Sequence, residues 1–151
     1  MKDDCWLPFL REDVPETLCS PPDVARWELR GQPCELIREP DWNDAFSIEE
    51  TKGRFTLRGG DTGLLYAAYH WLMARRAGRS AVRVRQAPEH SLRMLNHWDN
   101  MTGQIERGYA GRSLWFEGGA VAYDAQRLRQ YARLLASVGI KLRFPNNVTF
   151  V

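Results

Sequence analysis

LRMLNHW at residues 92–98 and IKLRF at residues 140–144 are the two stretches that decide the fold of this chain. Each is an apolar run of strand length, and the segment between them contains a helix pattern. Asp124 is placed to cap that helix, and Gly139 is placed to end it. The inward face of the helix would carry four apolar residues: Leu128, Tyr131, Leu134 and Leu135. A strand, a helix and a strand in this order predict a βαβ unit with parallel strands and a right-handed crossover.

A long glycine-containing loop is expected between the first strand and the helix, from Asp99 to Tyr123. Trp98, Asp99 and Asn100 leave the carboxyl end of the strand, where ligand sites of parallel α/β proteins lie. Trp98 offers a flat apolar face for a sugar ring, and polar side chains nearby can bond hydroxyl groups. The same residue types also fit a buried structural network.

In that structural alternative, Glu106 pairs with Arg93 or Arg107. Composition and spacing do not decide between a ligand site and a buried structural network.

The length of the chain conflicts with a complete parallel sheet. Such sheets usually have several strands covered on both faces, and a closed (β/α)8 barrel takes about 250 residues. The chain has 151 residues, and few of them follow the second predicted strand. We therefore expect the chain to be a fragment.

An α+β unit is predicted upstream. Phe46 and Ile48 alternate with polar residues, and a turn at residues 51–53 leads to a second alternating run with Phe55 and Leu57, which predicts a hairpin. Asp61 is the expected N-cap of a helix over residues 62–77 that Gly78 ends. Three residues form its expected inward stripe: Leu65, Tyr69 and Leu72. One more strand is expected around Val82 and Val84.

Six prolines interrupt the first forty residues. Two short strands, at residues 6–10 and 34–37, and a short helix after Ser20 with Val24 and Trp27 on one side are expected there. Pro88 marks the expected domain boundary, which gives an α+β domain over residues 1–87 and a second domain over residues 88–151.

Composition limits the classes of function. Hydrophobic residues make up 44% and charged residues 26% of the chain, which indicates a packed core, and the formal net charge of +2 gives no indication of a nucleic-acid or membrane partner. The acidic start does not resemble a signal peptide, so a cytoplasmic location is expected. The cysteines and histidines are too scattered for a disulfide framework or a metal site, and neither a metal nor a cofactor is expected: Cys5, Cys19, Cys34, His70, His90 and His97.

The run RMLNHWDNMTGQIERGYAGRSLWF, residues 93–116, resembles the signature of the α-glucuronidases of glycoside hydrolase family 67 at the start of their barrel. YARLLASVGI at residues 131–140 and NNV at residues 146–148 resemble the first barrel helix and second strand of that family. GRFTLRGGDTGLLYAAYHWL at residues 53–72 resembles the end of its N-terminal domain. The resemblance implies an α+β N-terminal domain followed by the first βαβ of a TIM (β/α)8 barrel, truncated here.

The resemblance also implies a function. Members of the family hydrolyse α-1,2-linked (4-O-methyl)glucuronic acid from xylooligosaccharides in xylan degradation, with inversion and without a metal. Two positions carry over as substrate-binding residues: Trp98, which lines the uronic acid pocket, and Val148, near the 4-O-methyl group. Both follow the carboxyl ends of strands and would face one cleft.

No catalytic residue carries over, because the acid, the base and the residues that bind the uronate carboxylate belong to later strands. The chain alone is therefore expected to be inactive. Its expected partner is an aldouronic acid, with no nucleic acid and no membrane, and a homodimer is compatible with a full-length version. The second strand departs from the family at Lys141, Arg143 and Pro145, which places charge and a missing N–H donor in a barrel strand.

Other residues invite functional interpretations that have structural alternatives. One functional interpretation makes Asp99 and Glu106 a catalytic pair, and another makes His97 a general base. Structural roles are favoured for all three residues, since the family places its carboxylates elsewhere. Tyr69 and Trp71 are expected in the core. Five arginines suggest RNA binding but fit a solvated rim better: Arg75, Arg76, Arg79, Arg83 and Arg85.

The competing classes of function for the whole chain are a non-catalytic carbohydrate-binding or interaction module and an inactive gene remnant.

Overall fold

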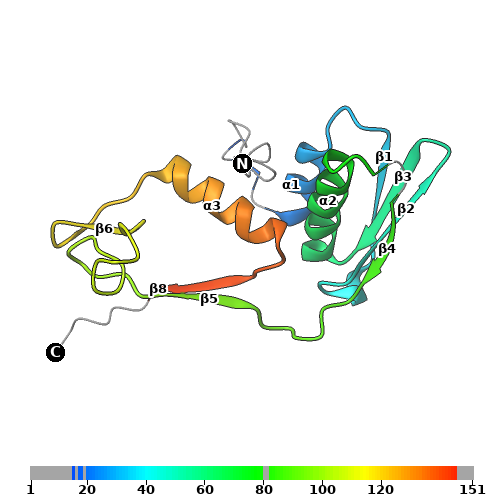
Figure 1. Cartoon of the computed structure of the whole chain (residues 1–151). Coiled ribbons are helices and arrows are strands. Elements are labelled where there is room, and N and C mark those ends of the chain that lie inside the picture. The colour runs from blue at the N-terminus through cyan, green and yellow to red at the C-terminus, as the bar shows by residue number, and fades with distance from the viewer. Residues whose placement is uncertain (1–14, 16, 19, 80–81, 146–151) are drawn as a thin grey trace. The chain divides into compact units, whose positions relative to one another are not determined.

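The computed structural model describes residues 15, 17–18, 20–79 and 82–145 (Figure 1). The chain divides into two compact units. The first comprises Met1–Ser91 with Ala136–Val138, and the second comprises Leu92–Leu135 with Gly139–Val151. Each unit is described below by itself.

A mixed four-stranded sheet is the centre of the first unit. Its strands are β1 (Cys34–Arg38), β2 (Phe46–Thr51), β3 (Arg54–Gly59) and β4 (Arg83–Gln86), in the order β1-β3-β2-β4. β2 and β3 form the predicted antiparallel hairpin, and β4 also runs antiparallel to β2. β1 runs parallel to β3 at one edge. The strands expected around residues 34–37 and 82–84 are thus confirmed, and the strand expected at residues 6–10 lies outside the described residues.

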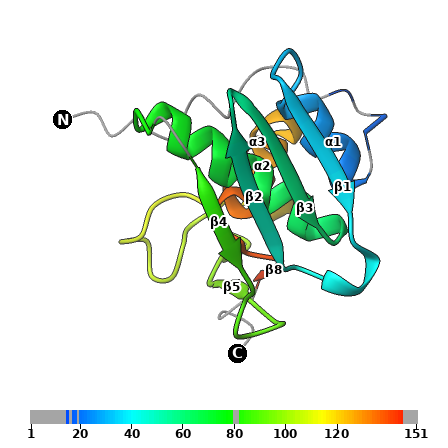
Figure 2. The same ribbon diagram turned by 90° about the vertical axis from the view of Figure 1, so that its right-hand side faces the viewer.

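Two helices lie behind this sheet in the view of Figure 2, and the opposite sheet face is turned to the viewer. α1 (Pro21–Glu28) begins after Ser20, whose side chain accepts a hydrogen bond from the backbone N–H of Asp23, as its N-cap pattern predicts. α2 (Asp61–Arg76) packs on β1, β2 and β3 and also on α1. A short 3-10 helix, η2 (Pro40–Trp42), precedes β2.

The core of the first unit lies between the sheet and α2. Ile48 and Leu57 on the two central strands are completely buried, and the Phe55 and Trp71 rings stack with centroids 3.9 Å apart. Tyr69 is also fully buried and donates its hydroxyl to Glu28 Oε1 at 2.9 Å. The expectation that Tyr69 and Trp71 belong to the core is confirmed.

Two details of α2 were predicted wrongly. The N-cap is Gly60, and Asp61 is the first helical residue, where its carboxylate binds Arg38 at 2.5 and 3.0 Å instead of capping the helix. Gly60 holds this position because a β-carbon there would lie 2.0 Å from the carbonyl oxygen of Asn43. The inward stripe was also wrong in part, because Leu65 and Leu72 are only partly buried.

A second layer explains the deeper burial of other residues on the same helix. α2 packs on α1 as well as on the sheet, so residues on both sides of the helix are covered. These include Leu64, Ala67, Ala68 and Trp71. A single stripe read from the sequence describes a helix with one neighbour and cannot describe one with two.

A parallel pair of strands characterises the second unit. β5 (Met94–His97) and β8 (Leu142–Pro145) pair in parallel, with α3 (Ala125–Ser137) between them in sequence. The predicted βαβ order is confirmed, although β8 begins two residues later than expected and includes Pro145 opposite His97. Lys141 precedes the strand and is exposed.

Asp124 caps α3 as predicted, since its carboxylate accepts from the backbone N–H groups of Gln126 and Arg127. Within the described residues the parallel sheet has these two strands, and no barrel is formed.

The segment expected as a plain loop contains a small hairpin that the sequence analysis missed. β6 (Phe116–Glu117) pairs antiparallel with β7 (Ala120–Val121). Gly118 and Gly119 connect them with positive φ angles of 59° and 86°, the backbone that a tight hairpin turn needs. The Gly-Gly pair was the available signal, but strands of two residues carry no alternation to support it.

Candidate functional site

The carboxyl ends of β5 and β8 lie side by side, and the candidate site is at the end of β5. Two hydrogen bonds fix the opposite end of the pair. The backbone N–H of Lys141 donates to the Arg93 carbonyl at 3.0 Å, and Arg93 Nε donates to the Gly139 carbonyl at 2.7 Å. The register that follows places His97 opposite Pro145. Parallel strands commonly position ligand-binding residues just beyond this edge.

Trp98 is the first residue after β5, and backbone contacts fix its position. Its carbonyl accepts the Glu106 N–H at 2.7 Å, and the next residue, Asp99, forms an antiparallel bridge with Ile105. The Asn100 side-chain amide donates to the Glu106 carbonyl. Residues 98–106 are therefore a hydrogen-bonded turn of the chain.

The rest of this loop folds back on the same turn. The Ile105 N–H donates to the Gly111 carbonyl at 3.0 Å, and the Ser113 N–H donates to the Gly103 carbonyl at 2.7 Å. Gly103 has a φ angle of +91°, and a β-carbon there would lie 2.9 Å from the Phe116 carbonyl oxygen. Glycine is required at this position both for its backbone angle and for the close approach of the chain.

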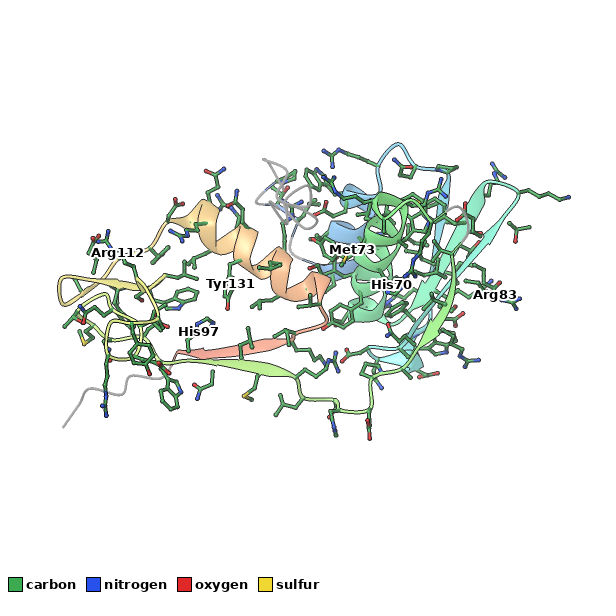
Figure 3. The ribbon with its side chains drawn as sticks, in the orientation of Figure 1. His70, Met73, Arg83, His97, Arg112 and Tyr131 are labelled. Atoms are coloured by element: carbon green, nitrogen blue, oxygen red, sulfur yellow. The ribbon has the colours of Figure 1, made fainter. Side chains whose placement is uncertain are left out.

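A polar and aromatic cluster lies between the end of β5 and α3. The hydroxyl of Tyr131 on α3 is 2.5 Å from His97 Nε2, and the two side chains point toward one another (Figure 3). His97 Nδ1 lies 3.6 Å from Asp99 Oδ2. The Trp115 ring meets the imidazole edge to face, with centroids 6.5 Å apart.

Trp98 lies on the other side of the chain from this cluster. Successive side chains of an extended strand point to opposite faces, and His97 and Asp99 share the side of α3. Trp98 between them is 46% exposed. An exposed indole on a fixed backbone is suited to stack on a flat, partly apolar ligand such as a sugar ring.

The two predicted substrate-binding residues have different outcomes. Trp98 is exposed at the end of the first strand of the parallel pair, the position expected from the sequence. Val148 lies outside the described residues. That the two residues face one cleft, and that either contacts a substrate, stay predictions.

The polar residues near Trp98 are held within the loop. Asp99 is 1% exposed and forms a bridge with Ile105. Glu106 accepts a hydrogen bond from the Tyr109 hydroxyl, which raises the pKa of that tyrosine. Among the ion pairs of the described residues, none joins Glu106 to Arg93 or Arg107.

His97 is hydrogen-bonded, as the structural interpretation expected. The sequence analysis missed its partner, because Tyr131 was placed on the inward face of its helix as an apolar residue.

Neither a metal nor a membrane is indicated by the described part of the chain. It contains no group of three or more His, Cys, Asp or Glu side chains that could hold a metal ion. None of its helices is long and apolar enough to span a bilayer. Cys34 is a free thiol whose pKa is raised by burial, so it is a weak nucleophile at neutral pH.

The arginines that suggested RNA binding are exposed in the first unit. Arg75 pairs with Glu50 at 3.4 Å, and Arg85 lies over the Trp42 ring at 5.3 Å. Arg83, labelled in Figure 3, is on β4 with its cross-strand neighbour Glu49. Acidic and aromatic neighbours fit a solvated rim better than a surface for phosphates.

Residues 72–150, more than half of the chain, match the sequence model of the glycosyl hydrolase family 67 middle domain. The chain belongs to glycosyl hydrolase family 67. The matched segment contains the whole of β5, the Trp98 loop and α3. The candidate site therefore lies in the part that family 67 members share.

Curated relatives of this family 67 chain include proteins from several Aspergillus species. The chain is 46% identical over 130 residues to the probable alpha-glucuronidase A of Aspergillus fumigatus and 40% identical over 128 residues to that of Aspergillus niger. It is 39% identical over 128 residues to the alpha-glucuronidase A of Aspergillus tubingensis. Each match covers 83% of this chain and 15% of the relative, so the chain spans about 15% of the length of these proteins.

Proposed function

We propose that this chain is the front part of an α-glucuronidase that hydrolyses α-1,2-linked (4-O-methyl)glucuronic acid from xylooligosaccharides, with inversion at the anomeric carbon. The family 67 match over residues 72–150 carries the proposal. Relatives named alpha-glucuronidase A support it. The substrate would then be an aldouronic acid derived from glucuronoxylan.

The domain arrangement is part of the same proposal. Residues 1–87 would be the α+β N-terminal domain, and residues 88–151 would begin a (β/α)8 barrel. The parallel β5–β8 pair with α3 between them supports this assignment, because a strand, a helix and a parallel strand are the unit from which such a barrel is built. Met94 is 41% exposed and Trp98 is 46% exposed. Parallel sheets are normally buried on both faces, so further barrel strands would be expected to enclose these side chains.

Trp98 would bind the sugar ring, and Val148 would lie near the 4-O-methyl group. An inverting glycosidase needs two carboxyl groups about 6.5–9.5 Å apart, one as the acid and one as the base. Asp99 is 1% exposed, which argues against its contact with a substrate. We therefore assign no catalytic residue to residues 1–151 and expect no turnover by this chain alone.

The test uses the longest reading frame that contains this chain, assayed on aldouronic acids for release of uronic acid. Proton NMR of the first product identifies the anomer, which would be the β-anomer for inversion of an α-linkage. The 151-residue chain, assayed in parallel, should give no product. The proposal would be contradicted if the protein encoded by the long frame hydrolysed these substrates without specificity for the uronic acid.

A paired substitution tests the Trp98 assignment. Trp98→Ala should lower kcat/KM about five- to tenfold, because loss of a stacked aromatic contact costs on the order of 1–1.4 kcal/mol. The control is Trp27→Ala on α1, where the indole is half-buried under the Arg30 guanidinium. Equal kcat/KM values for Trp98→Ala and the unsubstituted enzyme would remove Trp98 from the site.

Two alternative functions, a carbohydrate-binding module and a gene remnant, predict different results for the same proteins. A carbohydrate-binding module would bind aldouronic acids saturably in calorimetry without turnover, and a gene remnant would show neither binding nor turnover. The expected cytoplasmic location and the homodimer of a full-length version are further predictions, which cell fractionation and size-exclusion chromatography test.

A further inference from the structure

A chain of three polar side chains connects α3 to the segment that carries Trp98. Tyr131 contributes its hydroxyl, His97 both ring nitrogens and Asp99 a carboxylate oxygen, with separations of 2.5 and 3.6 Å. The carboxylate is buried, and its Oδ2 atom has no hydrogen-bond partner among the described residues. A buried acceptor without a donor is costly, so the nearby imidazole nitrogen has a reason to carry a proton.

These positions favour one proton arrangement on His97. An ionised carboxylate can only accept hydrogen bonds, so the Nδ1 atom that faces Asp99 should be the protonated nitrogen. In the neutral ring Nε2 is then an acceptor, and the Tyr131 hydroxyl donates to it. The opposite tautomer would set an unprotonated nitrogen against the carboxylate oxygen, which is unfavourable.

Trp98 lies in sequence between two members of this array. His97 and Asp99 are anchored on the side of α3, and Trp98 is directed to the opposite, exposed side. The Trp98 carbonyl is also bonded to the Glu106 N–H at 2.7 Å. Rotation of the backbone at Trp98 would therefore disturb the contacts of both neighbouring residues, His97 and Asp99.

We infer that His97 is a positioning residue, held by Tyr131 and Asp99 as its Nδ1-protonated neutral tautomer, and that this array sets the orientation of the Trp98 indole. The effect on catalysis rests on the proposed function, whereas the tautomer and the orientation of Trp98 do not. His97 does not touch the substrate in this arrangement, since its ring is directed toward α3.

The tautomer can be measured on the 151-residue chain by nitrogen-15 NMR of its three histidines. His97 should show a protonated Nδ1 and an unprotonated Nε2 at neutral pH, in signals assigned separately from those of His70 and His90. An Nε2-protonated neutral ring, or a doubly protonated ring, at His97 would overturn the inference. This measurement needs no substitution.

Two substitutions separate the array from general stability. Asp99→Asn should convert His97 to the Nε2-protonated form, because an amide can offer its N–H to Nδ1. Tyr131→Phe removes only the hydroxyl, so His97 should keep its proton on Nδ1, which still faces Asp99, and Nε2 should lose its hydrogen-bond partner. The control is Tyr123→Phe, at an exposed tyrosine ahead of α3, which should leave the His97 signals unchanged.

The orientation of Trp98 is read from its indole N–H signal and from its quenching by acrylamide, assigned with Trp98→Phe. Tyr131→Phe should change both readouts, and Tyr123→Phe should change neither. An unchanged Trp98 signal in both Tyr131→Phe and Asp99→Asn, despite an altered environment of His97, would overturn the positioning role.

Kinetics in the longest reading frame distinguish this inference from the proposed function. Tyr131→Phe should lower kcat about 3- to 10-fold with little change in thermal stability, because small misplacements of a binding group cost rate. If Trp98→Ala lowers activity and Tyr131→Phe does not, the positioning role fails and the proposed site stands. If Trp98→Ala has no effect, the proposed site fails, and the NMR results still decide the tautomer.

Discussion

The two units of this chain are stabilised in different ways. The buried apolar cluster of the first unit extends from Ala25 to Val82 and has a sheet, α2 and α1 as its layers. Among the described residues of the second unit, Leu135 is the one hydrophobic residue that is buried. Large apolar side chains there are exposed instead: Leu92, Met94, Leu95, Trp98, Tyr109, Val121 and Tyr123.

Polar contacts replace apolar packing in the second unit. Asp99, Asn100 and Arg133 are buried there, and the loop after β5 is fixed by backbone hydrogen bonds. The first unit thus has an apolar core between layers, as domains usually do, whereas the described residues of the second unit bury few apolar side chains around the candidate site. Substitutions in the two units should therefore differ in their effects.

Leu57→Ala is expected to have the largest effect. The side chain is fully buried on a central strand, so its truncation should lower the free energy of unfolding of the first unit by about 2–5 kcal/mol. The matched substitution in the second unit is Met94→Ala, at a side chain 41% exposed, which should cost under about 1 kcal/mol. Urea unfolding followed by circular dichroism measures both, and equal costs would contradict the comparison.

Gly63→Ala should have the next largest effect. A β-carbon at this position of α2 would lie 2.2 Å from the Ala45 carbonyl oxygen, so the helix must move from the segment before β2. Overpacking of this kind costs about 1–3 kcal/mol. Gly31→Ala is the control, because its β-carbon would meet nothing within 4 Å, and only the φ angle of +77° is unfavourable. A melting temperature of Gly63→Ala at or above that of Gly31→Ala would show that the close approach is relaxed in solution.

Asp124→Ala should destabilise the second unit locally. It removes the carboxylate that accepts two backbone N–H groups at the start of α3, which costs about 0.5–2 kcal/mol. Amide hydrogen exchange should accelerate along α3 and remain unchanged in α2. Asp23→Ala on α1, at a half-exposed carboxylate, provides a comparison in which the Ser20 cap remains. Uniform acceleration across both units would mean that they unfold together.

Protonation of His70 should have the smallest effect. Burial and, secondarily, the charge of Arg79 lower the pKa of His70 from 6.5. The unfolded chain therefore binds the proton more readily, and the free energy of unfolding should fall as the pH decreases from about 6.5 through the lowered pKa. Above that range the neutral ring has no such cost. The free energy of unfolding is measured against pH for the unsubstituted chain and for His70→Gln, and the difference between the two isolates the contribution of His70. Parallel curves for the two proteins would contradict this prediction.

Local chemistry made much of both units predictable. The Phe46–Leu57 hairpin, the Ser20 and Asp124 caps and the βαβ order follow from alternation, capping and helical spacing, which depend on neighbours in the sequence. The face of α2 that is buried depends on α1, and the role of Tyr131 depends on a histidine 34 residues away. Such pairings are tertiary, so patterns along one sequence do not determine them.

The candidate site shows the same division. The position of Trp98 after a strand could be read from the sequence, and so could the preference for a structural His97. The Tyr131 hydroxyl bond could not, because a tyrosine on the inward stripe of a helix is usually apolar packing. The one indication of this bond in the sequence was the hydroxyl group of the tyrosine, since a buried tyrosine hydroxyl normally has a hydrogen-bond partner.

Gly118 and Gly119 at the tip of the β6–β7 hairpin affect how the site loop tolerates changes in length. Both are exposed, and a β-carbon at either would meet nothing within 4 Å. The hydrogen bond between Tyr131 and His97 closes the intervening chain into a ring, and doubling the length of such a ring costs only about 0.6 kcal/mol in closure entropy. Extra residues at this tip would extend into solvent, and they would leave the anchors of Trp98 in place if the Gly119 N–H keeps its bond to the Met101 carbonyl.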